Sequence, residues 1–247
     1  MARTSSTSRL TAGTRTVSER RVIVRDMEDC LLFGGSEYVQ ITNPNINIRE
    51  FSVSFRALTA VNTNNSGFND WLSINGASGG EFCLETQGSL ASPSGYRISG
   101  FTGAGDVNSS PSIPLANKGW KMIHLVASQA GNYVRIYVNR VLTGSSSWAP
   151  GSEVISSIRF GSRGSASSRG IKAYMNQLRI FNSPLTQAEI DDDYYSGIYN
   201  TKLERQYLIN EASGTSVVDT SGNGGSIGVI TSATWALIGP MKVRTSS

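Results

Sequence analysis

The chain has 247 residues, of which 38% are hydrophobic and 16% are charged, with 26 glycines and a formal net charge of +4. This hydrophobic content argues against a wholly disordered chain, and no stretch of about 20 apolar residues is present that could cross a bilayer as a helix. Many short strands joined by turns are the architecture that such a Gly-rich, weakly charged sequence favours.

The basic charge is concentrated at the start of the chain. Residues 1–25 contain six arginines and one acidic residue, which leaves 16 basic and 17 acidic residues for the rest. We predict a flexible basic arm over 1–25, followed by one domain over 26–247. The arm lacks the interleaved aromatic residues that stack on bases, so a tether onto another protein is favoured over nucleic acid binding. The predicted docking residues are Arg3, Arg9, Arg15, Arg20, Arg21 and Arg25.

No secretory signal is expected, because the first residues contain no apolar run of 7 to 15 residues. This favours a product that stays in the cytoplasm or leaves it by lysis, and a Ser- and Arg-rich organellar transit peptide is the alternative. Cys30 and Cys83 belong to no Cys-x-x-Cys or Cys/His cluster. We therefore predict two buried thiols rather than a disulfide, and no zinc site.

Strand patterns follow one another along the chain. In 51–57 the apolar Phe51, Val53 and Phe55 alternate with Ser52 and Ser54, which predicts a half-buried strand. The predicted strands occupy 30–41 (two strands around a Gly-Gly turn), 51–57, 71–74, 81–86, 96–101, 121–128, 133–139, 154–161 and 176–182. Many strands with few helices predict a sandwich or jelly roll.

One segment, 184–196, is predicted to be a helix. It contains "EIDDDYY", whose alternating carboxylates resemble the catalytic strand of family 16 glycoside hydrolases. However, Thr186 and Glu189 form a Thr-x-x-Glu capping box, and Leu185 and Ile190 form the accompanying hydrophobic staple. In such a helix the carboxylates do not converge, so we expect no glycosidase site here.

Several of these segments together resemble the laminin G-like, concanavalin A-like jelly-roll family. The resemblance rests on "LLFGGSEYVQI", "FSVSF", "GWKMIHLVAS" with "VRIYVNRVL", and "NQLRIFNSPLTQAEI", and covers about residues 30 to 200. It implies an all-β, antiparallel sandwich with one short helix. Residues 207–235 resemble a segment that often precedes the opening strand, so 203–247 is predicted to complete the same domain in permuted order; a truncated second repeat is the alternative.

The chain departs from the family pattern at two places. Asn176 and Gln177 stand where the family has an acidic pair, and Arg140 follows Asn139 where the family has Gly. The first departure lowers the expectation of a bound calcium ion. The remaining calcium candidates are weak, since each loop has one Asp and turn formation explains it. They are Asp106 and Asn108 in one loop and Asn64, Asn69 and Asp70 in another. We expect no cofactor.

A sugar site needs an aromatic face beside amides and carboxylates. The candidates are Asn69, Asp70, Trp71, Tyr96 and Trp148. Trp120 and Trp235 are assigned to the core. His124 is the only histidine, and its strand position predicts a hydrogen-bonded structural role instead of catalysis.

The resemblance implies a non-enzymatic virion surface protein, since domains of this kind occur in bacteriophage decoration proteins, head fibres and tail fibres. The arm would dock on other virion proteins or sister subunits, after synthesis in the host cytoplasm, and the sandwich would face outward and hold cell-surface glycans. A carbohydrate-binding, lectin-like module acting outside a virion is the alternative. Fold alone does not decide between them.

Overall fold

The computed structural model describes residues 28–59, 68–77, 81–87, 95–100, 107–108, 119–150, 154–163, 170–195 and 201–238. Only the backbone is described for residues 28, 59, 68, 86–87, 95–100 and 107–108. The predicted arm over 1–25, and with it every docking arginine named above, lies outside the described residues. In the part of the chain that is described, no helix has the length and apolar character needed to cross a membrane.

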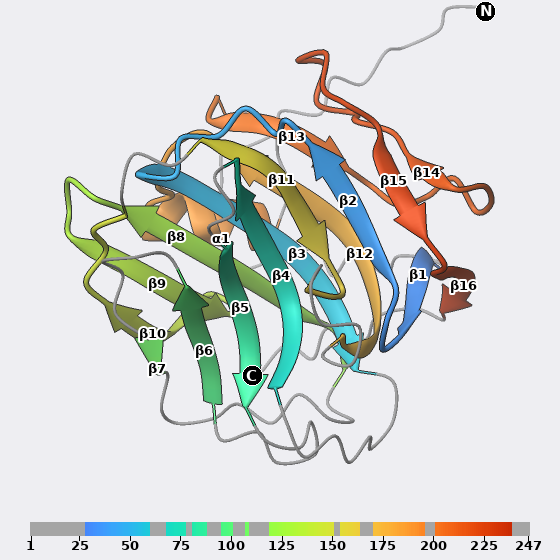
Figure 1. Cartoon of the computed structure of the whole chain (residues 1–247), viewed down its shortest axis with the longest axis horizontal. Coiled ribbons are helices and arrows are strands. Elements are labelled where there is room, and N and C mark those ends of the chain that lie inside the picture. Colours follow the sequence, from blue (N-terminus) through green and yellow to red (C-terminus); the bar gives the residue numbers. More distant parts are fainter. Residues whose placement is uncertain are drawn as a thin grey trace, which may run out of the picture.

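Two antiparallel sheets are stacked on each other, as Figure 1 shows. The strand order of sheet A is β10 (Val141–Ser146), β9 (Tyr133–Val138), β8 (Lys121–Ser128), β3 (Glu50–Thr59), β12 (Lys172–Phe181), β1 (Glu28–Gly34) and β16 (Thr234–Ile238), and β13 (Leu203–Tyr207) also pairs with β12. The strand order of sheet B is β14 (Ser216–Val217), β15 (Gly228–Thr231), β2 (Tyr38–Thr42), β11 (Ile155–Phe160), β4 (Phe68–Gly76), β5 (Glu81–Gln87), β6 (Gly95–Gly100) and β7 (Val107–Asn108). The predicted all-β sandwich with one short helix is confirmed.

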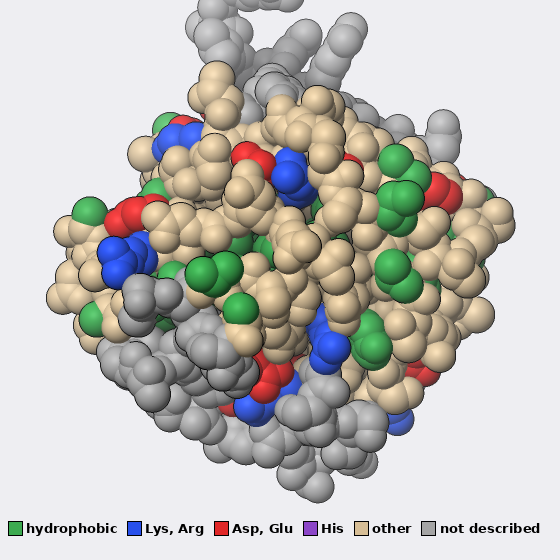
Figure 2. Space-filling view, turned by 45° about the horizontal axis from the view of Figure 1, so that its top comes forward, with side chains coloured by type: hydrophobic (Ala, Val, Ile, Leu, Met, Phe, Trp, Pro, Cys, Tyr) green, Lys and Arg blue, Asp and Glu red, His purple; other side chains and the backbone are tan. Residues whose placement is uncertain are grey.

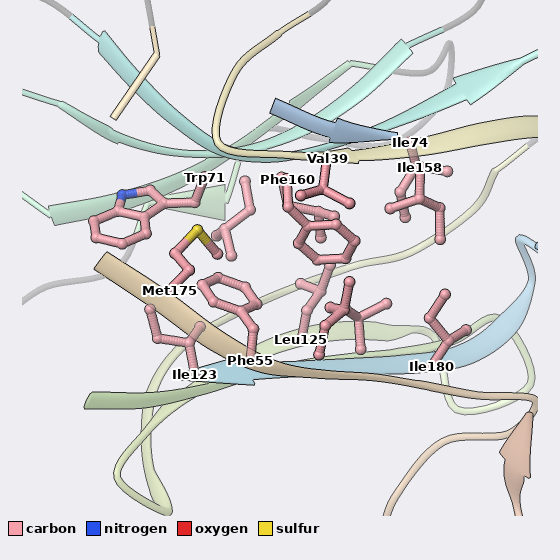
Figure 3. Packing of buried hydrophobic residues seen from close by; sticks show 14 of the residues in the cluster. Val39, Phe55, Trp71, Ile74, Ile123, Leu125, Ile158, Phe160, Met175 and Ile180 are labelled. Carbon is pink, nitrogen blue, oxygen red and sulfur yellow. The ribbon is translucent and has the colours of Figure 1, made fainter. Parts of the chain in front are cut away.

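The hydrophobic core fills the space between the sheets. Figure 3 shows Phe55 and Met175 from sheet A facing Trp71 and Phe160 from sheet B. The rings of Phe55 and Trp71 stack with centroids 6.2 Å apart. The predicted thiols are confirmed: Cys30 and Cys83 are both buried, and they do not form a disulfide.

Strand β3 is buried on both faces, so the prediction of a half-buried strand over 51–57 is wrong. Val53 and Phe55 face the core, and Ser52 and Ser54 on the other face are also 0% exposed. The reason is helix α1 (Gln187–Tyr195), which lies on the side of sheet A away from sheet B (Figure 1). Alternation of apolar and polar residues does not tell whether the polar face of a strand is exposed to solvent or covered by another element.

Helix α1 begins with the predicted capping box. The backbone N–H of Thr186 donates to Glu189 Oε2 (2.7 Å), and the N–H of Glu189 donates to Thr186 Oγ1 (3.3 Å). Leu185 and Ile190 are buried in one small cluster that packs the helix on sheet A. The helical reading of "EIDDDYY" is therefore confirmed, and its carboxylates take separate partners.

The C-terminal segment supplies strands to both sheets. β13 pairs with β12 and β16 with β1 in sheet A, while β15 pairs with β2 in sheet B. The indole of Trp235 in β16 donates to the carbonyl of Gly214 (2.8 Å), which ties the last strand to the loop before β14. Trp235 is only partly buried against the core, and Trp120 is half-buried under the guanidinium of Arg56 (5.7 Å).

Candidate functional site

An open pocket of about 460 Å³ lies at the end of the sandwich where β2 and β11 meet the loop before β3. Its volume falls within the roughly 300–1,000 Å³ that small-molecule sites occupy. It is lined by Asn43, Asn45, Ile46, Asn47, Val154 and Ile155. Three asparagines and three aliphatic residues, none of them charged, therefore line one space.

The sequence "NPNIN" places the three amides on the solvent side. Asn43, Asn45 and Asn47 are exposed, whereas Pro44 between them is buried and Ile46 is partly buried against the core. Asn43 and Asn45 have φ angles of +46° and +56°, a left-handed conformation that asparagine tolerates better than most residues.

The walls of the pocket are held by hydrogen bonds. The backbone N–H of Asn43 donates to the carbonyl of Ser156 (2.8 Å), and that of Ala77 donates to the carbonyl of Val154 (2.8 Å). Asn47 Oδ1 accepts from the N–H of Arg49 (3.0 Å), an Asx turn that leads into β3. At the base, the indole of Trp148 donates to the carbonyl of Ile48 (3.0 Å).

These bonds leave a defined set of polar atoms available on the lining asparagines. Asn45 Nδ2 donates to Glu204 Oε1 (2.9 Å), which leaves the Asn45 oxygen as an acceptor. Asn47 uses its oxygen, which leaves its amide nitrogen as a donor. Among the described residues Asn43 finds no side-chain partner, so it offers both groups. An acceptor beside a donor suits adjacent hydroxyl groups, since each hydroxyl both donates and accepts.

Charged side chains are scattered around this end of the molecule. Figure 2, which brings the top of Figure 1 forward, shows them among described side chains that are mostly uncharged, with small separate hydrophobic areas. Behind the pocket, the carboxylate of Glu204 is paired with Arg205 Nη1 (3.0 Å). A charged ligand would therefore find no free counter-ion among the lining residues.

A second polar cluster lies buried between α1 and sheet A. Asp193 Oδ2 accepts from Ser54 Oγ (2.8 Å) and lies 2.9 Å from His124 Nε2, while Asp193 Oδ1 accepts from Arg179 Nη1. Burial alone would raise the pKa of Asp193, but the hydrogen bond from His124 and the charge of Arg179 outweigh it and hold the pKa below its usual value.

This cluster contains Ser, His and Asp but lacks the geometry of a catalytic triad. Both Ser54 and His124 contact the aspartate oxygen, so His124 has no hydrogen bond to the serine that it would have to deprotonate. Both residues are 0% exposed. The cluster fastens α1 to the sheet, which agrees with the structural role predicted for His124.

Two of the predicted sugar-stacking residues lie in the core, and this corrects the sequence-based site. Trp71 and Trp148 are both 0% exposed, so neither ring can stack on a sugar from solvent. A bulge in the pairing of β4 with β5, between Asp70 and Leu72, brings the two consecutive residues Trp71 and Leu72 into the core. Trp148 packs edge-on against Phe82 at 5.1 Å.

The other residues predicted to bind sugar or calcium form no exposed site in the described part of the chain. Asn69 and Asp70 begin β4 and are 0% exposed. The side chain of Tyr96 and the calcium candidates Asn64 and Asp106 lie outside the described part, and the structure describes only the backbone of Asn108. Within the described residues no group of three His, Cys, Asp or Glu side chains is arranged to hold a metal.

The sequence profile of the concanavalin A-like lectin/glucanases superfamily, in its third laminin G group, matches residues 33–191. The chain belongs to this superfamily. The match runs from Phe33 in β1 to Asp191 in α1. It therefore includes the pocket lined by Asn43, Asn45 and Asn47, which we call the asparagine pocket, and most of both sheets. No curated protein sequence matches the chain.

Solved structures of the superfamily share the fold at low identity. A candidate carbohydrate binding protein from Bacteroides ovatus is 14% identical with a TM-score of 0.67, over 89% of this chain and 63% of its own. A heptameric SAP-like pentraxin from Limulus polyphemus is 12% identical with a TM-score of 0.56, over 82% of this chain and 95% of its own. Domain 4 of a Geobacillus stearothermophilus arabinanase, in complex with arabinotriose, is 18% identical with a TM-score of 0.50, over 66% of this chain and 75% of its own.

The acidic pair expected of the superfamily is replaced by buried amides. Asn176 and Gln177 are 4% and 7% exposed and sit at a bulge in β12, where Gln177 has a φ of +53°. The amide of Gln177 contacts the guanidinium groups of Arg56 and Arg179. Neutral groups thus occupy the position between two buried cations.

The sequence-based site missed Asn43, Asn45 and Asn47. The available signal was their spacing, because these exposed asparagines alternate with the more buried Pro44, Ile46 and Ile48. The apolar wall from Val154 and Ile155 carried no such signal, since it comes from a strand more than 100 positions later in the chain.

Proposed function

We propose that the protein is a non-catalytic carbohydrate-binding domain and that the asparagine pocket takes a neutral sugar. The observation that carries the proposal is an open space of about 460 Å³ that is lined by three asparagines and three aliphatic residues. The amides match adjacent hydroxyl groups, and the aliphatic side chains match the C–H face of a sugar ring.

The family relationship supports the same class of ligand. One neighbour in fold is described as a candidate carbohydrate binding protein and another was solved with arabinotriose. The chain spans only 63% of the Bacteroides ovatus protein, so the function of that whole protein is not transferred.

The lining of the pocket favours neutral over anionic sugars. Burying a carboxylate without a cation is unfavourable, and no lining residue is charged. Because no aromatic ring lines the pocket, we expect weak binding, with a Kd on the order of 1 mM, or about 4 kcal/mol.

Titration calorimetry of the full chain with glucose, galactose, arabinotriose and N-acetylneuraminic acid tests the proposal. Asn43→Gly removes one amide while tolerating the left-handed φ. Loss of its hydrogen bonds should weaken binding of a neutral sugar about 2–10-fold. Asn132→Gly is the matched control, because Asn132 is also exposed and has a φ of +51°. Equal weakening by both variants would remove this pocket from the proposal.

A second proposal concerns where the domain acts. We propose that residues 1–25 tether it to a particle surface, as in a virion surface protein made in the host cytoplasm. The observation that favours this role is the segregation of six arginines into the first 25 residues, beside a remainder with 16 basic and 17 acidic residues. Sedimentation of the full chain and of residues 26–247 with particles from its source tests it. Co-sedimentation of the full chain alone supports the tether, and sedimentation of neither contradicts it.

A further inference from the structure

A surface beside the end of α1 combines exposed apolar, aromatic and charged side chains. Leu142 and Tyr195 are 48% and 43% exposed, and they are two of the eight large hydrophobic residues that stand out as exposed in the described part of the chain. Single exposed apolar residues are ordinary, but apolar and aromatic residues close together mark an interaction surface. We call this the α1–β10 surface, and it consists of Arg140, Leu142, Asp191, Tyr194 and Tyr195.

Arg140 forms the centre of this surface in an unfavourable backbone conformation. It and Asn139 form the two-residue turn between β9 and β10, with φ angles of +74° and +49°. Turns of this kind favour Asn followed by Gly, because every residue with a Cβ is disfavoured at positive φ. A non-glycine residue kept in such a conformation points to a role for its side chain.

The contacts of Arg140 orient its side chain without enclosing it. Its guanidinium carbon lies 4.4 Å from the ring centroid of Tyr195 and 5.2 Å from that of Tyr194. Its Nη1 is 3.6 Å from Asp191 Oδ1, and the two side chains are 34% and 38% exposed. Gln187 Nε2 donates to the carbonyl of Arg140 (3.1 Å), which fixes the turn against α1. The guanidinium of Arg140 is thus positioned over two tyrosine rings. Tyr and Arg are enriched among the residues that carry most of the binding energy in protein interfaces.

We propose that the α1–β10 surface binds the same surface of a second copy of this chain. It holds a cation and an anion side by side, so a strongly acidic or strongly basic partner would meet a like charge. Around a twofold axis each residue meets its complement, which brings Arg140 of each copy toward Asp191 of the other, with Leu142 and Tyr195 between them. Residues 26–247, with 16 basic and 17 acidic side chains, do not repel a second copy.

Sedimentation velocity of the full chain from about 1 to 100 µM tests the proposal, a range typical of modest homodimers. The expected result is a concentration-dependent species of twice the 26.5 kDa chain mass. Leu142→Arg should leave only the monomer at every concentration. Val229→Arg is the matched control, because Val229 is 53% exposed on β15, a strand of the other sheet, and this variant should still dimerise.

Arg140→Gly separates recognition from folding. Glycine suits the positive φ, so the variant should fold as well as the wild type, whereas its dimer should dissociate at least tenfold more readily. A wild-type chain that stays monomeric at 100 µM overturns the proposal. So does a dimer that survives Leu142→Arg, or one that is lost in Val229→Arg alone.

Discussion

Replacing Asp193 by Asn should destabilise the protein strongly, because Asp193 is the anion that joins α1 to sheet A. The side chain of Asp193 is 4% exposed and that of Arg179 is 3% exposed, so their ion pair is shielded from solvent. Asparagine keeps the volume but leaves the guanidinium of Arg179 without a negative partner. Breaking a buried pair in this way costs about 3–5 kcal/mol of unfolding free energy.

Thermal and urea unfolding, followed by circular dichroism, measure that cost. For a chain of this size each kcal/mol lowers the melting temperature by about 2–4 °C, so a loss of about 6–20 °C is expected. Asp191→Asn is the control: it lies two positions earlier and is 38% exposed, so it should change stability by less than about 1 kcal/mol. If the two variants melted within 2 °C of each other, the buried pair would not be the anchor of the helix.

Three further predictions concern the same framework. The pKa of Asp193 is lowered from about 3.8, so its stabilising contribution to the folded state is present above that pH and disappears as the pH falls through the folded-state pKa. The unfolding free energy of the wild type should therefore drop below about pH 4. A parallel drop in Asp193→Asn would argue against Asp193 as the cause. Glu189→Ala removes the capping box and the 2.7 Å bridge to Lys202, and urea unfolding should show a loss of about 1 kcal/mol; a loss above 3 kcal/mol would mean that Glu189 does more than cap the helix. Trp71→Ala should cost about 3–5 kcal/mol, with any sugar affinity of the folded fraction unchanged; selective loss of sugar binding with normal stability would return Trp71 to the binding site.

The fold was predictable where the pattern is local. Strand β8 has the predicted bounds, 121–128, and the capping box at Thr186 places the start of α1. These features depend on neighbours within a few residues, and each has one dominant physical cause. The family resemblance added the jelly-roll fold, which no single local pattern contains.

The site was less predictable because it depends on contacts between distant segments. Trp71 was assigned to a sugar site, but a bulge beside it brings it into the core. Ser54 is buried with a hydrogen bond to Asp193, and Ser52 is buried with hydrogen bonds to Ser183 and Leu185, all more than 100 positions later in the chain. The alternation argument was applied to Glu189, where a helix invalidates it, and not to the asparagines at 43, 45 and 47, where exposed and buried positions do alternate.

The most direct test of the carbohydrate-binding proposal is an amide NMR titration of the full chain with arabinotriose and with galactose. The account predicts that the side-chain amide signals of Asn43, Asn45 and Asn47 and the backbone signals of Val154 and Ile155 shift together, and that Asn43→Gly weakens the effect. Shifts confined to another part of the molecule would contradict the asparagine pocket, and no shift with any sugar at about 20 mM, well above the expected Kd, would contradict the function itself.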